Sequence, residues 1–203
     1  NPPVITASAG VGGKKEGEGP LRNEFDEVFD DTTMGQESFE QAESALLKNA
    51  VIRALTKANK SAADVDFIMT GDLLNQCTGS CFALTDLEIA YIGMYGACST
   101  MALTLCNSAM LIDAGAHCCV AGASSHFASS ERQFRYPLEY GGQRPPTSQW
   151  TVTGAGAAVV VKNGNGPKIK AIHIGTITDL GIKDANNMGA AMAPAAAKTI
   201  SDF

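Results

Sequence analysis

The chain turns at Tyr95-Gly96-Ala97-Cys98-Ser99-Thr100-Met101, between a short apolar strand pattern at 89–94 and a long apolar helix pattern at 99–114. Small residues on both sides of Cys98 allow a sharp turn. A side chain at a helix start also faces unpaired backbone N–H groups and the positive end of the helix dipole, and both favour a thiolate. The stretch therefore predicts a nucleophile elbow, whose cysteine either carries out chemistry or lines a binding pocket.

Alternating strand and helix patterns surround this elbow. The predicted strands are 5–9, 65–70, 89–94, 118–123, 151–162 and 168–178, and the predicted helices are 39–59, part of 78–86, and 99–114. Ser38 and Gln41 form a capping box for the first helix, and the helix at 99–114 is apolar or small on nearly every face, which predicts burial all round. Residues 11–19 and 124–149 are predicted loops, and 163–167 is a hairpin-type turn. This order indicates a layered α/β domain with a mixed sheet.

Composition limits the class of protein. The chain has 203 residues, 45% of them hydrophobic, which suffices for one buried domain or for part of a larger one. A net charge of −6 argues against nucleic acid as the main partner. No segment reaches the roughly 20 unbroken apolar residues of a membrane span. The N-terminus also lacks a signal pattern, so we expect a cytoplasmic chain without a transmembrane segment.

The six cysteines lie mostly in apolar surroundings, without the density of a disulfide scaffold. Cys77, Cys81, Cys118 and Cys119, with His117, suggest a metal site at first sight. Adjacent strand residues point to opposite faces, however, and do not easily ligate one ion together. We therefore expect buried structural thiols and no metal.

An internal echo suggests two units. Met34-Gly35 and Met188-Gly189 each precede small and apolar residues at the same helical offsets, after a strand and a loop. We expect a first unit at 1–167 and the start of a second at 168–203.

Several uncommon strings resemble one family. They are Gly71-Asp72-Leu73-Leu74-Asn75-Gln76, Gly96-Ala97-Cys98-Ser99-Thr100, Ser124-Ser125-His126, Glu131-Arg132-Gln133-Phe134-Arg135-Tyr136-Pro137, Glu139-Tyr140-Gly141-Gly142-Gln143 and Met192-Ala193-Pro194-Ala195-Ala196-Ala197. With the order of elements, they resemble the stage V sporulation protein AD family, which is thiolase-like and related to β-ketoacyl-ACP synthase III. The resemblance implies a thiolase-like layered α/β fold with a mixed sheet, comprising the first half and the opening of the second. It also implies a sporulation protein that binds dipicolinic acid and supports its uptake into the developing spore.

The resemblance directs attention to six candidate ligand-binding residues: Cys98, Ser99, Thr100, His126, Arg132 and Arg135. Helix N–H groups and guanidinium forks suit carboxylates, and aromatic faces suit a planar ring. Alternative interpretations remain open. His126 is equally well explained as a loop histidine bonded to backbone, the arginines as part of a subunit interface, and Asp72 as a cap for the segment that follows it.

The implied partners are dipicolinic acid, alone or as its calcium chelate, other proteins of the stage V sporulation membrane complex, and a second copy in a homodimer. The implied location is cytoplasmic, peripheral to the spore inner membrane, with no cofactor. The alternative function is an acyltransferase of the β-ketoacyl synthase or thiolase type, using Cys98 as nucleophile on a coenzyme A thioester. Ser99-Thr100-Met101 departs from the Ala/Ser-Gly pattern that commonly follows the synthase cysteine. A third reading is a purely structural assembly partner.

Overall fold

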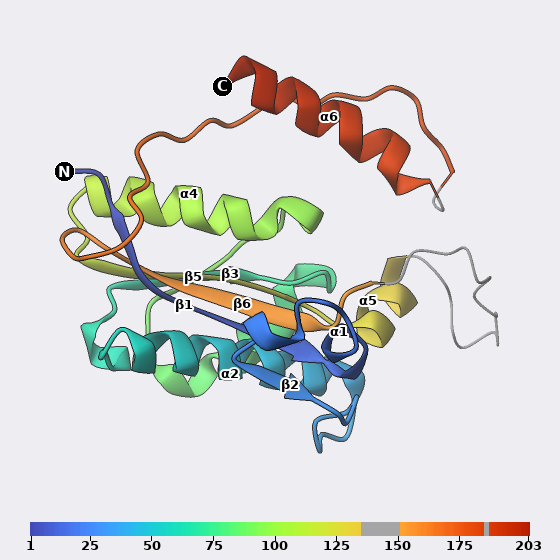
Figure 1. The fold of residues 1–203 in the computed structure, drawn as a ribbon, viewed down its shortest axis with the longest axis horizontal. Helices are drawn as coiled ribbons and strands as arrows, with labels where there is room; N and C mark the ends of the chain where they lie inside the picture. Colours follow the sequence, from blue (N-terminus) through green and yellow to red (C-terminus); the bar gives the residue numbers. More distant parts are fainter. Residues whose placement is uncertain (135–150, 185–186) are drawn as a thin grey trace.

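A six-stranded mixed sheet separates helical layers in the computed structural model (Figure 1). The model describes residues 1–134, 151–184 and 187–203, and the side chains of these ranges apart from 131–134. The strands are β1 (Val4–Gly13), β2 (Glu27–Phe29), β3 (Phe67–Gly71), β4 (Tyr91–Gly93), β5 (Cys118–Ser125) and β6 (Gly154–Val161). The α-helices are α1 (Lys14–Gly17), α2 (Phe39–Lys57), α3 (Thr78–Ala83), α4 (Thr100–Asp113), α5 (Phe127–Phe134) and α6 (Met188–Asp202). Helix α2 covers one face of the sheet, α4 covers the other, and α6 lies outside α4 (Figure 1).

The strand order is β2-β1-β6-β5-β3-β4. Strand β6 runs antiparallel to both of its neighbours, β1 and β5, whereas the other pairs are parallel. The mixed sheet predicted from the sequence is therefore confirmed. Within the described ranges, no helix is both long and apolar enough to cross a membrane.

The predicted strand at 168–178 is wrong. Apart from an isolated antiparallel bridge between Val4 and Lys168, this segment has no strand, and Ile177 is fully exposed. A hairpin needs a free edge on the preceding strand, but β1 and β5 already occupy both edges of β6. The chain therefore leaves the sheet after Val161.

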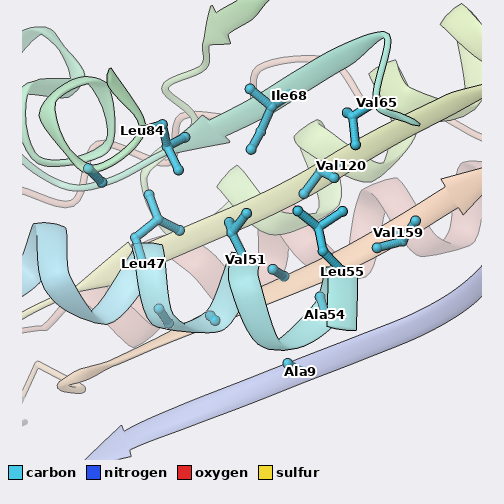
Figure 2. Packing of buried hydrophobic residues seen from close by; sticks show 14 of the residues in the cluster. Ala9, Leu47, Val51, Ala54, Leu55, Val65, Ile68, Leu84, Val120 and Val159 are labelled. Carbon is cyan, nitrogen blue, oxygen red and sulfur yellow. The ribbon is translucent and has the colours of Figure 1, made fainter. Parts of the chain in front are cut away.

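Helix α2 supplies much of the core. Its start is fixed by Ser38, whose side chain accepts a hydrogen bond from the Gln41 amide at 3.2 Å. The Gln41 side chain accepts from the Glu37 amide instead of from Ser38, so half of the predicted capping box forms. The fully buried side chains along the helix include Leu46, Leu47, Ala50, Val51 and Ala54. Figure 2 shows this face packed against strands β3, β5 and β6. Each large aliphatic side chain buried in this way contributes about 1.5–3 kcal/mol.

Helix α4 is not buried all round, contrary to the prediction. Its buried residues are Thr100, Thr104, Ser108, Ala109 and Ile112, while Met110 on another side is 39% exposed. The hydroxyls of Thr100 and Thr104 donate to carbonyls of the preceding turn, and that of Ser108 donates to Sδ of Met69 in β3 at 4.0 Å. The sheet covers only one side of α4, and α6 covers part of the other.

Two predicted loops contain regular structure. Strand β1 continues through Gly13 because β2 and β6 pair with its second half, and α1 follows directly. Helix α5 occupies 127–134, within the predicted loop at 124–149, and its buried Ala128 and Ser129 lie where α5 packs on α2. Both elements depend on partners distant in the sequence. Residues 135–150 of that loop lie outside the described ranges.

Gly71, at the end of β3, permits the closest approach in this region. A Cβ at this position would overlap the carbonyl oxygen of Met94 and lie 2.7 Å from Cγ2 of Thr100. We expect Gly71→Ala to lower the free energy of unfolding by at least about 2 kcal/mol. The measurement is urea unfolding of the full-length protein.

Gly189→Ala in α6 is the matched control, because a Cβ there meets nothing within 4 Å. It should leave the free energy of unfolding within about 1 kcal/mol of the parent value. Equal stabilities for the two variants would contradict the close packing described at Gly71.

Candidate functional site

Cys98 lies at a braced elbow, as predicted. Strand β4 leads through Met94 into a short 3-10 turn at Ala97–Ser99, and α4 begins at Thr100. Ala97 has a left-handed φ of 46°. The hydroxyl of Ser99 donates to the Gly96 carbonyl at 2.7 Å, and that of Thr100 donates to the Ala97 carbonyl at 2.8 Å while accepting from the Gly96 amide at 3.1 Å. Ser99 and Thr100 thus hold the turn that presents Cys98.

The exposed thiol of Cys98 opens onto a cavity of about 910 Å³ at the carboxyl ends of β3 and β5. Its described lining is Val11, Phe25, Leu73, Tyr95, Ala97, Cys98, Thr100, Met101, Ala123, Ser124, Ser125, Thr151, Val152, Gly154, Ala155, Gly156 and Met188. Most of these residues are apolar or small. Among the described lining residues none carries a carboxylate, an imidazole or a cationic side chain, so the only ionisable groups there are the Cys98 thiol and the Tyr95 phenol.

The start of β6 forms one wall of this cavity with the small residues Gly154, Ala155 and Gly156. A Cβ at Gly154 would lie 2.8 Å from the Val11 carbonyl oxygen in β1. Close strand packing therefore explains this glycine, and the absence of large side chains here leaves room for the cavity.

His126 lies fully buried beside the cavity-lining end of β5, and it is not among the described lining residues. Its Nδ1 accepts from the Ala128 amide at 3.2 Å, and Nε2 lies 2.8 Å from the Thr32 carbonyl, which fixes the Nε2–H tautomer. Phe39 and Phe127 stack against the His126 ring, with distances between ring centroids of 5.1 and 5.0 Å. Of the two sequence interpretations, this geometry matches the histidine held by backbone, although buried and not in a surface loop.

The predicted arginines are only partly placed. Arg132 lies in α5, which follows the cavity-lining residues Ser124 and Ser125, but its side chain is outside the described set. Arg135 lies outside the described residues altogether. Their contact with a ligand stays a prediction.

The sequence analysis missed Glu43, which is fully buried next to the cavity wall. Its Oε2 accepts from the Ser129 hydroxyl at 2.6 Å, and its Oε1 accepts from the Ser124 hydroxyl at 3.3 Å. Burial raises the pKa of Glu43 from 4.5 to about 8, and the nearby carboxylate of Asp72 adds to the rise. The position of Glu43 on the apolar face of the predicted helix at 39–59 is the sequence signal that could have indicated its burial.

Asp72 is the second buried acid, and it acts as the cap predicted from the sequence. It accepts from the Leu74 amide at 2.7 Å and from the amide and hydroxyl of Ser80 at 2.5 and 2.7 Å. In the described part of the chain, no cluster of three or more His, Cys, Asp or Glu side chains is arranged to hold a metal ion.

Comparison with known proteins gives one consistent family. A family model described as Stage V sporulation protein AD (SpoVAD) matches residues 1–203. The curated Stage V sporulation protein AD of Bacillus subtilis (strain 168) is 45% identical over 200 residues, which cover 98% of this chain. The chain spans 59% of the length of that relative.

Solved structures show the same fold at low identity. Xanthomonas campestris OleA, crystallised as a cysteine-to-serine variant with bound lauric acid and lauroyl-CoA, matches with a TM-score of 0.65 and 13% identity, covering 100% of this chain and 72% of its own. The 3-oxoacyl-[acyl-carrier-protein] synthase III of Aquifex aeolicus VF5 matches with a TM-score of 0.54 and 15% identity, covering 80% of this chain and 55% of its own. The fold is therefore thiolase-like, as predicted.

The cysteines should differ sharply in reactivity. Cys98 is exposed, whereas Cys119 is fully buried and burial raises its pKa to about 12. We expect iodoacetamide at pH 7.5 to label Cys98 at least about 100-fold faster than Cys119, because only accessible thiolates react. Peptide mapping by mass spectrometry measures both rates in one sample. Comparable labelling of the two cysteines in folded protein would contradict this arrangement.

Glu43 should make stability depend on pH. The folded state holds the Glu43 proton up to about pH 8, while the unfolded chain releases it near 4.5. The free energy of unfolding should therefore fall as pH rises from 4.5 to 8, by at most roughly 5 kcal/mol at about 1.36 kcal/mol per pKa unit. Urea unfolding across this range should show a flatter profile for Glu43→Gln. Identical profiles would show that Glu43 does not titrate in this way.

Proposed function

This chain belongs to the stage V sporulation protein AD family, and from that premise we propose that it binds dipicolinic acid and supports its uptake into the developing spore. The observation that carries the proposal is the cavity at Cys98. It is open, about 910 Å³ in volume, and placed at the N-terminus of a long helix. A planar dicarboxylate is the ligand class that the family suggests for such a cavity.

The lining suits a small aromatic acid. Phe25, Leu73 and Val152 offer apolar contact for a ring. The amides of Ser99 and Thr100 already donate to the carbonyls of Gly96 and Ala97, so an anion at the elbow is stabilised by the positive end of the α4 dipole. Since the described lining has no cationic side chain, the second carboxylate is assigned to Arg132 or Arg135, or to a calcium ion chelated by the ligand.

The same proposal includes the partners and the organisation of the protein. It places a homodimer at the cytoplasmic side of the spore inner membrane, held there by other stage V sporulation proteins. Residues 1–167 form the first thiolase-like half and 168–203 the start of the second. The helix that begins at Met188, where the sequence repeat predicts one, supports this division.

Acyl transfer is the second candidate, favoured by the exposure of Cys98 at an elbow in a largely apolar cavity. Cys98 would attack a coenzyme A thioester, form an acyl-enzyme and release coenzyme A thiol. That reaction also needs a base, and the described lining provides none besides the thiolate itself. The ligands bound to OleA, lauric acid and lauroyl-CoA, make a long-chain acyl thioester the first substrate to try.

Calorimetric titration of dipicolinic acid into the full-length protein tests the proposal, with and without calcium. We expect saturable binding, and we expect Val152→Trp to weaken it at least tenfold, because Val152 lines the cavity and is exposed enough to be enlarged without overpacking the core. Leu180→Trp is the matched control, since Leu180 is also exposed but lies outside the described lining.

Lauroyl-CoA is run in parallel, with intact-mass spectrometry of the protein. Dipicolinate binding without acylation supports the binding function. Absence of dipicolinate binding, together with stoichiometric acylation that is lost in Cys98→Ala, would replace it with acyl transfer.

A further inference from the structure

Glu43 joins two segments at the cavity end of the sheet. Its carboxyl group accepts one hydrogen bond from the hydroxyl of Ser124, at the end of β5, and another from the hydroxyl of Ser129, in the first turn of α5. Ser124 is also one of the residues lining the cavity at Cys98. Glu43 therefore lies directly behind the cavity wall, on the side covered by α2.

The described surroundings of Glu43 contain acids and neutral groups. Glu40 of its own helix and Asp72 after β3 both raise its pKa, and no described cation forms an ion pair with it. From the β5–α5 junction, both nitrogens of His126 are engaged with backbone groups. An ionised Glu43 would therefore be a buried charge next to a second carboxylate, and the hydrogen bonds from Ser124 and Ser129 lower its pKa less than burial raises it.

The serine hydroxyls around Glu43 can accept as well as donate, so they are compatible with a neutral carboxyl group. When Glu43 is neutral, its O–H can donate to Ser129 Oγ, 2.6 Å away, while the Ser129 hydroxyl donates to the His126 carbonyl at 3.4 Å. Asp72, by contrast, has three donors, two of them backbone amides. The two buried acids thus have different hydrogen-bond environments, since Glu43 receives hydroxyl donors alone whereas Asp72 receives backbone amides as well.

We propose that Glu43 is a positioning residue that must be uncharged for the cavity at Cys98 to hold an anionic ligand. This inference rests on the proposed binding function and adds its dependence on protons. When Glu43 is neutral, the wall formed by Ser124 has no net charge behind it. When Glu43 ionises, its charge opposes a dicarboxylate across the wall to which Ser124 belongs, and it strengthens the hydrogen bond that the Ser124 hydroxyl donates to it.

The coupling between Glu43 protonation and ligand binding can be measured as a pH dependence of the Kd. If only the neutral form binds, a pKa of about 8 for Glu43 makes the Kd for dipicolinate rise about 30-fold between pH 6.5 and pH 9.5. By reciprocity, binding at pH 8.5 takes up protons. The ligand carboxylates stay ionised across this range and add no dependence of their own.

The experiment is calorimetric titration of dipicolinic acid into the full-length protein between pH 6.5 and pH 9.5, repeated at pH 8.5 in buffers of different ionisation enthalpy. We expect the 30-fold weakening and net proton uptake in the parent protein. Glu43→Gln, which matches the neutral acid in shape, should bind at pH 6.5 and lose both effects. The matched control Glu37→Gln removes an exposed carboxyl two residues before the start of α2. It should retain the pH dependence of the Kd and the proton uptake.

Other ionisable groups in the cavity require their own variants. Cys98→Ser and Tyr95→Phe remove the thiol and the phenol of the described lining and, whatever their affinity at pH 6.5, should keep the pH dependence. If Cys98→Ser abolishes the dependence, or if Glu43→Gln keeps it, the inference is overturned while the binding function stands. If dipicolinate fails to bind the parent protein at every pH, the proposed function and this inference fail together.

Discussion

The central position of β6 is the constraint on which the rest of the structure depends. Its two antiparallel ladders join the β1–β2 pair to the β5–β3–β4 group, and among the described residues no other strand pairing connects the two groups. Because both edges of β6 are occupied, the chain beyond Val161 must leave the sheet, and it returns as α6 outside α4 (Figure 1). The start of the same strand, Gly154–Gly156 in sequence, forms a wall of the cavity. The placement of β6 thus determines how the sheet is joined, where the chain runs after Val161 and which residues form one wall of the cavity.

The cavity end is built by close approach of backbone. Gly71 lets the carbonyl of Met94 lie against the end of β3. That contact fixes the position of the elbow, which follows β4. The hydroxyls of Ser99 and Thr100 then hold the turn, so the sulfur of Cys98 stays exposed at the head of α4. Ligand crevices in open α/β sheets commonly lie beyond the carboxyl ends of the strands, and this cavity has that position. A binding protein and an acyltransferase would both use such a cysteine, because the fold alone does not select the chemistry.

Buried acidic side chains behind the cavity wall add ionisable groups that the lining itself nearly lacks. The described lining is nearly free of ionisable groups, yet two buried acids lie on the α2 side of the sheet. Asp72 accepts from two backbone amides and the Ser80 hydroxyl, whereas Glu43 accepts from the hydroxyls of Ser124 and Ser129, and the carboxylates of Asp72 and Glu40 raise its pKa. A neutral Glu43 would reconcile a buried acid with the anion site proposed in the neighbouring cavity. Proton binding, local stability and ligand affinity are then parts of one equilibrium.

Local signals in the sequence predict the helix that begins after Ser38, the strand at 118–123, and the elbow at Cys98 with its family strings. Only the tertiary structure decided that 168–178 is not a strand and that His126 is buried. It likewise placed Glu43 behind the cavity wall. Periodicity and capping reflect interactions within a few residues, so they can be read along the chain. Free strand edges and the charge around an acid are set by segments far apart in sequence, and no local pattern encodes them. The apolar periodicity around Glu43 indicates that its side chain is buried, but not what surrounds it.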